Sequence, residues 1–276
     1  MRKKLHIILF IVVAISLSSC GWTKKGSYNK LLKSSDYNAK YEAAMKYYNQ
    51  EDYFKATQLF ENLSLYYRGR ERAEAVALYH AKSLVGMKDY YSAGFQFDLY
   101  FRQFPYSENA EEALYLSAYC KYLESPVYSL DQRLTKDAIT SFNLYLEKYP
   151  NSPRIEKVNQ YIDELRAKII KKDYETAYNY YKIYAYSSAH LALNEFLYKY
   201  PNSIYREEAM FYLIKSGYEY AKNSIVEKQL IRYKQLINDI DKFIVYFDQS
   251  SYKKEVQKIY EKGKAEIALL ENNKEK

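Results

Sequence analysis

Three segments of the chain share one pattern of apolar positions and align without gaps. Residues 93–105, 138–150 and 189–201 each begin with alanine and end with an aromatic residue followed by proline. Their apolar residues recur at intervals of three and four, which is the spacing of an amphipathic helix, and proline marks the end of such a helix. The pattern therefore predicts three equivalent helices, each of which ends at its proline.

A second kind of helix is expected before these segments. Ala73, Ala110 and Arg206 each open a segment in which glutamate follows directly, and acidic residues in a first turn suit the helix dipole. Ala81, Ala118 and Ile214 then fall at matching positions, where close approach of a neighbouring helix favours a small residue. The two kinds of helix alternate, which predicts a series of helix pairs.

Five helix pairs and a closing helix can be drawn on the sequence. The pairs occupy residues 36–69, 71–105, 108–150, 153–201 and 204–248, and the closing helix covers about 251–271. A single pair cannot bury its own apolar face, so the pairs should stack into an all-α solenoid. Residues 125–133 interrupt the third pair as an insertion, and residues 153–185 are either one overlong helix or two short ones. A generic helical bundle is the alternative.

The N-terminal segment has the organisation of a secretion signal. Arg2, Lys3 and Lys4 are followed by the nearly apolar residues 5–17, a stretch too short to span a bilayer. We therefore expect a signal peptide over residues 1–19.

The residues that end this signal resemble the lipobox of bacterial lipoproteins. Leu17-Ser18-Ser19-Cys20 places small residues directly before a cysteine. The resemblance implies cleavage before Cys20 and attachment of diacylglycerol and an N-acyl chain, and two or three acyl chains anchor a protein stably. An ordinary cleaved signal is the alternative. No aspartate follows Cys20, which resembles the outer-membrane address, so the periplasmic face of the outer membrane is expected. The polar residues 20–35 are expected to form the lipidated cysteine and a flexible tether.

Composition narrows the function classes. The chain has 36 Tyr and 12 Phe but only 7 Gly and 5 Pro, which leaves few turn-formers for a many-stranded sheet. The formal net charge of +8 includes the three basic residues of the leader, and no basic stripe of the kind that binds nucleic acid follows them. With Cys20 lipidated, Cys120 has no disulfide partner and is expected to be a small buried residue.

Catalytic chemistry is not predicted. His6, His80 and His190 are isolated from one another in the sequence, and no group of residues has the spacing of metal ligands. Neither a Gly-rich phosphate loop nor a nucleophile elbow is present in the sequence. Apart from the covalent lipid on Cys20, no cofactor is expected, and the chain is predicted not to be an enzyme.

The helix pairs resemble the tetratricopeptide repeat (TPR), a helix–turn–helix of about 34 residues. Combined with the lipobox, five such pairs resemble the BamD family of outer-membrane-assembly lipoproteins over nearly the whole chain. The most specific match is the insertion with Asp131-Gln132-Arg133, followed by a helix that ends Tyr149-Pro150-Asn151-Ser152. Arg68-Gly69 departs from the family, whose first repeat often has Tyr-Pro there.

The resemblance implies a non-enzymatic role in the outer-membrane β-barrel assembly machinery, the BAM complex. Members of the family bind the periplasmic domains of the barrel insertase BamA and help to receive unfolded barrel precursors. Their N-terminal repeats, residues 36–150 here, are associated with the precursor. Their C-terminal repeats, in the segment 151–271 that includes the closing helix, are associated with the insertase. Residues 272–276 form a tail.

In this repeat type, the first helix of each pair lines a concave groove. The residues predicted to face it, and to bind a peptide or partner, are Asn38, Tyr41, Met45 and Tyr48 in the first pair, Leu78 and Lys82 in the second, and Glu112, Tyr115, Tyr119 and Tyr122 in the third. Tyrosine offers a large contact area at low entropic cost, which suits extended or aromatic-ended peptides. The alternative is that these tyrosines only pack between repeats.

Two other functions remain open. A TPR lipoprotein that serves as a scaffold for cell-envelope assembly, of peptidoglycan or of a pilus, would have the same fold. A glycan-capturing lipoprotein of nutrient uptake would need loop-rich insertions with Trp platforms, whereas the only tryptophan here is Trp22, in the tether.

Overall fold

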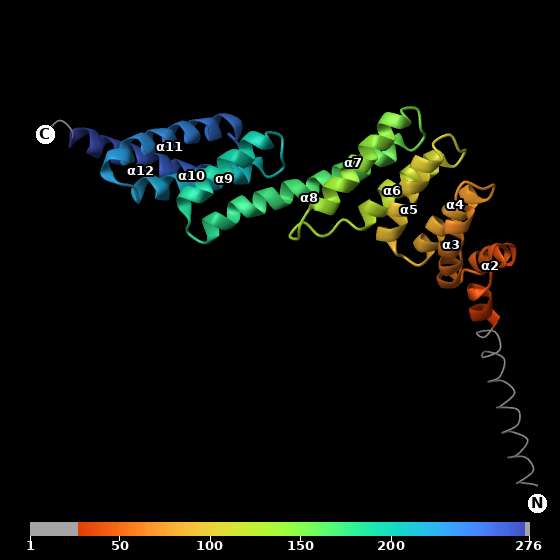
Figure 1. Ribbon diagram of the computed structural model, residues 1–276. Coiled ribbons are helices and arrows are strands. Elements are labelled where there is room, and N and C mark those ends of the chain that lie inside the picture. Colours follow the sequence, from red (N-terminus) through yellow and green to blue (C-terminus); the bar gives the residue numbers. More distant parts are fainter. Residues whose placement is uncertain (1–26, 274–276) are drawn as a thin grey trace, which may run out of the picture. The chain divides into compact units, whose positions relative to one another are not determined.

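The computed structural model describes residues 27–273, and every regular element in this range is a helix (Figure 1). Successive helices pack against one another over residues 37–148 and again over residues 186–272, which confirms the predicted all-α solenoid of helix pairs. The predicted signal peptide and Cys20 lie outside the described residues. Among the residues that are described, no helix is both long and apolar enough to cross a membrane.

The chain divides into two compact units. Within the described range, unit 1 runs to Ser125 and resumes over Arg133–Ile162, and unit 2 comprises Pro126–Gln132 and the residues from Asp163 onward. Unit 1 contains α2 (Tyr37–Asn49), α3 (Tyr53–Tyr67), α4 (Ala73–Gly86), α5 (Tyr90–Gln103), α6 (Ala110–Leu123), α7 (Arg133–Lys148) and the start of α8 (Ile155–Lys182). Unit 2 contains the rest of α8, α9 (Tyr186–Lys199), α10 (Arg206–Lys222), α11 (Val226–Tyr246) and α12 (Lys253–Asn272).

Aspartate begins three of these helices. The carboxylates of Asp36, Asp52 and Asp89 each accept a hydrogen bond from the backbone N–H three residues later, at the starts of α2, α3 and α5. Such a cap satisfies one of the amide groups that have no partner in a first turn. The helix starts are therefore encoded locally.

The proline-ended segments form α5, α7 and α9, the second helices of their pairs. Their shared alanine is fully buried in all three, at Ala93, Ala138 and Ala189. An apolar residue four positions later is also buried, namely Phe97, Phe142 and Leu193. Alanine allows the partner helix to approach, and the larger residue fills the space between helix pairs. The apolar positions that recur in the sequence are therefore the positions buried in the core.

The overlong segment of the fourth pair is one continuous helix. α8 spans Ile155–Lys182, which decides between the two possibilities left by the sequence. The predicted insertion is the connection between α6 and α7, and the buried Gln132 orders it. The Gln132 side-chain amide donates to the carbonyl oxygens of Val127 at 2.9 Å and Leu130 at 3.0 Å.

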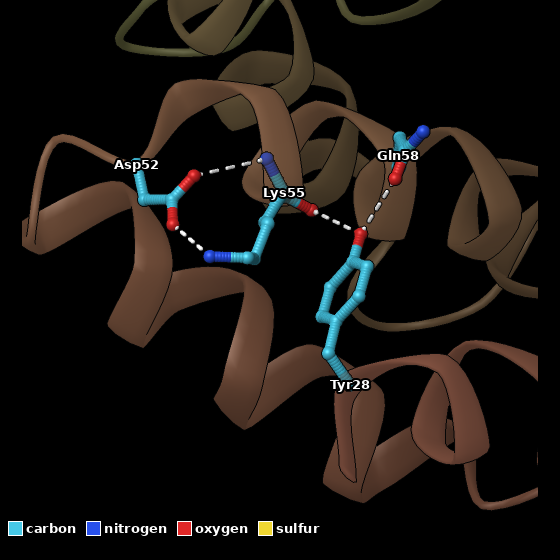
Figure 2. A network of polar contacts seen from close by, with 4 residues as sticks. All are labelled: Tyr28, Asp52, Lys55 and Gln58. Carbon is cyan, nitrogen blue, oxygen red and sulfur yellow. Dashed lines mark hydrogen bonds and ion pairs between the residues drawn. The ribbon is translucent and has the colours of Figure 1, made fainter. Parts of the chain in front are cut away.

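The predicted flexible tether differs from the structure in its last part. Residues 27–33 are helical, and Tyr28 is only 7% exposed. Its hydroxyl donates to Gln58 Oε1 at 2.8 Å and lies 3.2 Å from the carbonyl oxygen of Lys55, both on α3 (Figure 2). The burial of this ring against α3, together with its hydrogen bond, stabilises the helical conformation of residues 27–33. The polar composition of the segment did not predict this contact.

The surroundings of Tyr28 are themselves held in place. The Lys55 ammonium group forms an ion pair with Asp52, the residue that caps α3 (Figure 2). The same ammonium lies 5.0 Å from the centre of the Tyr47 ring, and Tyr47 meets Tyr28 edge to face at 5.5 Å. These contacts join residues 27–33 to the first helix pair, so within the described range the predicted tether contributes to unit 1.

Candidate functional site

A row of three tyrosines lies on α6, where the sequence predicted a groove surface. Tyr115, Tyr119 and Tyr122 are four and three residues apart, so they share one helix face. The Tyr115 and Tyr119 rings stack with centroids 5.9 Å apart, and those of Tyr119 and Tyr122 with centroids 5.8 Å apart. All three are half-buried, so part of each ring is accessible.

A fourth tyrosine, from the start of α8, completes the row. The Tyr161 ring lies 4.5 Å from that of Tyr122 and 5.4 Å from that of Tyr119. Beneath them, the buried Phe142 of α7 contacts Tyr161 at 5.6 Å and Tyr122 at 6.4 Å. We call Tyr115, Tyr119, Tyr122 and Tyr161 the tyrosine ladder. Sequence reasoning missed Tyr161, because the overlong α8 gave no repeat register from which to place it.

Positive charges flank the ladder. The Arg154 guanidinium lies 5.0 Å from the centre of the Tyr115 ring, and the Lys157 ammonium lies 4.8 Å from that of Tyr161. Cations at this range are attracted to the ring faces. Burial raises the pKa of Tyr115 to about 12, so its hydroxyl is neutral and able to donate at physiological pH. The surface therefore offers ring faces, hydroxyl groups and cations.

The predicted charged residues of the groove pair with each other. Lys82 Nζ lies 3.9 Å from Glu112 Oε1, an ion pair between α4 and α6, and both side chains remain partly exposed. Leu78, by contrast, is 7% exposed and packs in a core cluster with Ala81 and Phe97. Its apolar side chain fills the contact between helix pairs, so Leu78 belongs to the core and offers no surface to a ligand.

The predicted residues of the first helix pair make contacts of their own: Asn38, Tyr41, Met45 and Tyr48. The Arg72 guanidinium lies 4.5 Å from the centre of the Tyr41 ring. Tyr48 meets Tyr79 edge to face at 4.9 Å. Asn38 is exposed and accepts a hydrogen bond from the Tyr67 hydroxyl, whereas Met45 is half-buried against the core of this pair. Tyr41 and Tyr48 thus combine partial exposure with packing.

A partly buried polar triad, which sequence reasoning missed, holds the second helix pair. Glu74 Oε1, in the first turn of α4, accepts from the Tyr100 hydroxyl at 2.9 Å and from the Ser107 hydroxyl at 2.6 Å. Ser107 Oγ also accepts the backbone N–H of Asn109 at 3.0 Å. The hydrogen bonds from Ser107 and Tyr100 keep the pKa of Glu74 below its usual value.

The same triad recurs in the third pair. Glu111 Oε1 accepts from the Tyr145 hydroxyl at 2.8 Å and from the Ser152 hydroxyl at 2.7 Å. The hydrogen bonds from Ser152 and Tyr145 are again the main cause of a lowered Glu111 pKa. Arg154 Nη1 lies 3.6 Å from Glu111 Oε1, so the triad also positions the cation beside the tyrosine ladder. The sequence contains a signal for these triads, because Ser107 and Ser152 each lie two residues after the proline that ends a helix segment.

Unit 2 carries a similar row on the second half of α8. Tyr174, Tyr178 and Tyr181 repeat the four–three spacing, with ring centroids 6.0 Å and 6.3 Å apart. Tyr212 of α10 lies 4.4 Å from Tyr178 and 5.0 Å from Tyr181. The Lys182 ammonium lies 4.8 Å from the centre of the Tyr178 ring. This second row also escaped the sequence prediction, for want of a register in α8.

The tyrosine ladder and its flanking cations have the side-chain chemistry that is typical of protein interfaces. Partly exposed tyrosines and arginines are the side chains that contribute most at protein interfaces. Cys120 is 1% exposed and burial raises its pKa to about 12, which leaves an inert thiol. Among the residues that the structure describes, no cluster of His, Cys, Asp and Glu could hold a metal ion.

Comparison with known proteins agrees with the architecture. A family model described as YfiO, outer membrane lipoprotein, matches residues 33–178 and 170–273. The outer membrane protein assembly factor BamD of Helicobacter pylori (strain ATCC 700392 / 26695) is 24% identical over 172 residues, in an alignment that covers 61% of this chain and 74% of that relative. The match to the family model extends over both units and includes the tyrosine ladder.

Proposed function

Because the chain belongs to the YfiO family of outer membrane lipoproteins, we propose that it is a non-enzymatic component of the machinery that assembles β-barrels in the outer membrane. The similarity to BamD of Helicobacter pylori, an outer membrane protein assembly factor, supports this proposal. A lipid on Cys20 would hold it at the periplasmic face of that membrane.

The tyrosine ladder is the observation that carries the proposal. An unfolded barrel precursor presents extended segments in which apolar and polar side chains alternate, with aromatic side chains near the membrane interfaces. Stacked rings that are flanked by Arg154 and Lys157 can pack against such aromatic side chains and pair with acidic ones. We assign reception of the precursor to this surface in unit 1.

Unit 2 is assigned to the barrel insertase. It has a core of its own, formed by α10, α11 and α12 around Phe211, Ile214 and Phe243. A separately packed unit can hold one partner while the tyrosine ladder engages another. The protein would then act as a scaffold that brings precursor and insertase together.

Copurification tests this function directly. The native lipoprotein, solubilised in mild detergent and isolated through a C-terminal tag, should bring down a BamA-like insertase. Depletion of the lipoprotein from the cell should lower the amounts of β-barrel proteins in the outer membrane. Copurification of peptidoglycan enzymes or secretins, with normal barrel levels after depletion, would instead support a scaffold for cell-envelope assembly and refute the proposal.

Removing two rings of the ladder should weaken precursor binding. In the Tyr119→Ala/Tyr122→Ala variant, the dissociation constant for a synthetic peptide from the C-terminus of an outer-membrane barrel should rise about tenfold to a hundredfold, because interface tyrosines often contribute more than about 1 kcal/mol each. Fluorescence anisotropy with a labelled peptide measures the change.

A matched variant separates binding from folding. Tyr106 and Tyr198 are 100% and 91% exposed and lie outside the ladder, so Tyr106→Ala/Tyr198→Ala removes the same number of rings. It should leave the dissociation constant within about twofold, since surface substitutions rarely change energies by more than about 0.5 kcal/mol. Equal losses in both variants, or none in the ladder variant with an unchanged melting temperature, would contradict the assignment.

A further inference from the structure

A cationic pocket lies in unit 1, apart from the tyrosine ladder. Arg68, Arg70 and Arg72 occupy alternate positions at the turn between α3 and α4. Arg72 is engaged, because its guanidinium lies over the Tyr41 ring and Nη1 is 3.9 Å from Glu42 Oε1. Arg68 and Arg70 are exposed and form no ion pair with any residue in the described range. Two guanidinium groups without an ion-pair partner thus share one turn.

The turn that carries them is well defined. Arg68 ends α3, and Gly69 follows at φ 73°, a left-handed conformation that glycine adopts without strain. The Arg70 N–H donates to the carbonyl oxygen of Tyr67 at 2.8 Å, and the Ala73 N–H donates to that of Arg70 at 3.0 Å. These backbone hydrogen bonds fix the positions of the Cα atoms of Arg68 and Arg70.

The Arg70 guanidinium is also held by stacking. It lies 4.0 Å from the centre of the Tyr66 ring, which in turn stacks on Tyr37 at 3.6 Å and an interplanar angle of 7°. A guanidinium that rests on an aromatic face keeps its N–H edges free to bind in its own plane. Arg70 is therefore preorganised to bind an anion.

The two arginines border a cavity of about 580 Å³ between α3, α4 and α5. Its other lining residues include apolar and amide side chains, among them Val76, Leu99, Phe104, Gln96 and Gln103. No carboxylate is among the lining residues. Glu74, close by in the sequence, is occupied by its triad with Tyr100 and Ser107. The pocket also includes Ala73 at the N-terminus of α4, where the helix dipole is positive.

We propose that this pocket binds the phosphate headgroup of an anionic phospholipid. Guanidinium groups match phosphate oxygens in geometry and charge, and such bonds are roughly twice as strong as neutral ones. Leu99 and Phe104 provide apolar walls for the methylene groups next to the headgroup, whereas the amides of Gln96 and Gln103 suit its hydroxyl and ester groups. A zwitterionic headgroup would bring a cation toward Arg68 and Arg70, and is disfavoured.

The membrane is within reach of this pocket, and here the inference rests on the lipid anchor of the proposed function. Six residues, 21–26, separate Cys20 from the helical segment 27–33. At roughly 3.5 Å per residue, this stretch keeps the start of that segment within about 25 Å of the lipid. Tyr28 attaches the segment to the first half of α3, the helix whose C-cap is Arg68. The unit that carries the pocket therefore stays beside a phospholipid surface.

Native mass spectrometry of the full-length lipoprotein in nonionic detergent tests the proposal. Dioleoylphosphatidylglycerol should form adducts in preference to dioleoylphosphatidylcholine. The Arg68→Ala/Arg70→Ala variant should lower the phosphatidylglycerol adducts about tenfold or more, since the charge-assisted hydrogen bonds of both guanidinium groups to the phosphate are lost. Arg102→Ala/Lys148→Ala removes two exposed cations of the same unit and should change the adducts less than about twofold.

The outcomes are distinguishable from those of the proposed function, because neither the insertase nor a precursor takes part. Equal adducts with both lipids, or no change in the double arginine variant, would overturn the proposal. Millimolar inorganic phosphate that displaces the lipid completely would show that free phosphate is the ligand and would also overturn it. Arg68→Lys/Arg70→Lys should retain part of the binding, because the charge remains while the guanidinium fork is lost.

Discussion

Replacing Phe142 by alanine is expected to lower the free energy of unfolding of unit 1 by about 3–5 kcal/mol. The Phe142 side chain is 0% exposed and lies on α7 beneath two rings of the tyrosine ladder. Truncation removes its buried apolar surface and leaves a cavity that Tyr122 and Tyr161 can only partly fill. The loss of packing should therefore disorder the rings of the tyrosine ladder as well as destabilise the core.

Hydrogen exchange of the amides in α6 and α7 measures this effect for unit 1 alone, which avoids assuming a single transition for a chain of two units. Phe95→Ala on α5 is the matched control, because Phe95 is 62% exposed. It should change the free energy by no more than about 0.5 kcal/mol. If both variants lost protection from hydrogen exchange equally, the burial of Phe142 would not be what stabilises α6 and α7.

The same variant links packing to binding. Peptide affinity at the ladder should fall in Phe142→Ala even though Phe142 is buried and makes no contact with solvent. The physical reason is that Tyr122 and Tyr161 lose the surface that fixes their rings, and a mobile ring must be ordered again on binding. Unchanged affinity would mean that the ladder is ordered by its own stacking.

The helix pairs were predictable because their signals are local. Asp52 and Asp89 cap the helices that they precede, and a buried alanine, Ala56 or Ala93, follows four residues after each of them. Each signal depends on the residue and its near neighbours, so it can be recognised in one sequence. The order of the helices and their equivalence follow from such signals.

Contacts between distant residues could not be predicted in the same way. Leu78 was assigned to a groove surface by its repeat position, but its apolar side chain packs between helix pairs. Tyr28 lies in a polar segment and becomes buried only because α3 offers Gln58 as a partner. Tyr161 lies on a helix whose unusual length concealed its register. In each case the deciding neighbour is far away in the sequence.

The carboxylate triads show a partial success of the same kind. The position of Glu74 and Glu111 in a first turn was recognised, and it was attributed to the helix dipole. The structure adds that each carboxylate accepts two hydroxyl hydrogen bonds from residues 26 to 41 positions away. The dipole explains why an acid is tolerated there, whereas the triad explains what it holds together.

The triads should make the protein sensitive to acid. The pKa of both Glu74 and Glu111 is lowered in the folded state, chiefly by hydrogen bonds from Ser107 and Ser152 respectively. A carboxyl with a depressed pKa stabilises the fold above its unfolded value, and that stabilisation is lost as the pH falls through the folded value. The free energy of unfolding should therefore decrease below the ordinary glutamate pKa of about 4.5.

Glu74→Gln/Glu111→Gln is the variant that isolates this contribution. At neutral pH it should lower the free energy of unfolding by about 2–3 kcal/mol, because four hydrogen bonds to charged groups become neutral ones. The hydroxyls of the buried Tyr100 and Tyr145 would then have weaker acceptors. Urea unfolding at several pH values between 7 and 3 should show a shallower acid dependence in the variant than in the parent protein.

The control must remove a charge that no triad uses. Glu147 on α7 is exposed and forms no ion pair with any residue in the described range, so Glu147→Gln should leave both the stability and its pH dependence close to those of the parent. Parallel acid curves for the parent and the double variant would show that the triads are not the source of the sensitivity. A shallower curve for the double variant would show that the two triads cause the loss of stability of unit 1 at low pH. The physical reason is that a hydroxyl group forms a stronger hydrogen bond to an ionised carboxylate than to a protonated one.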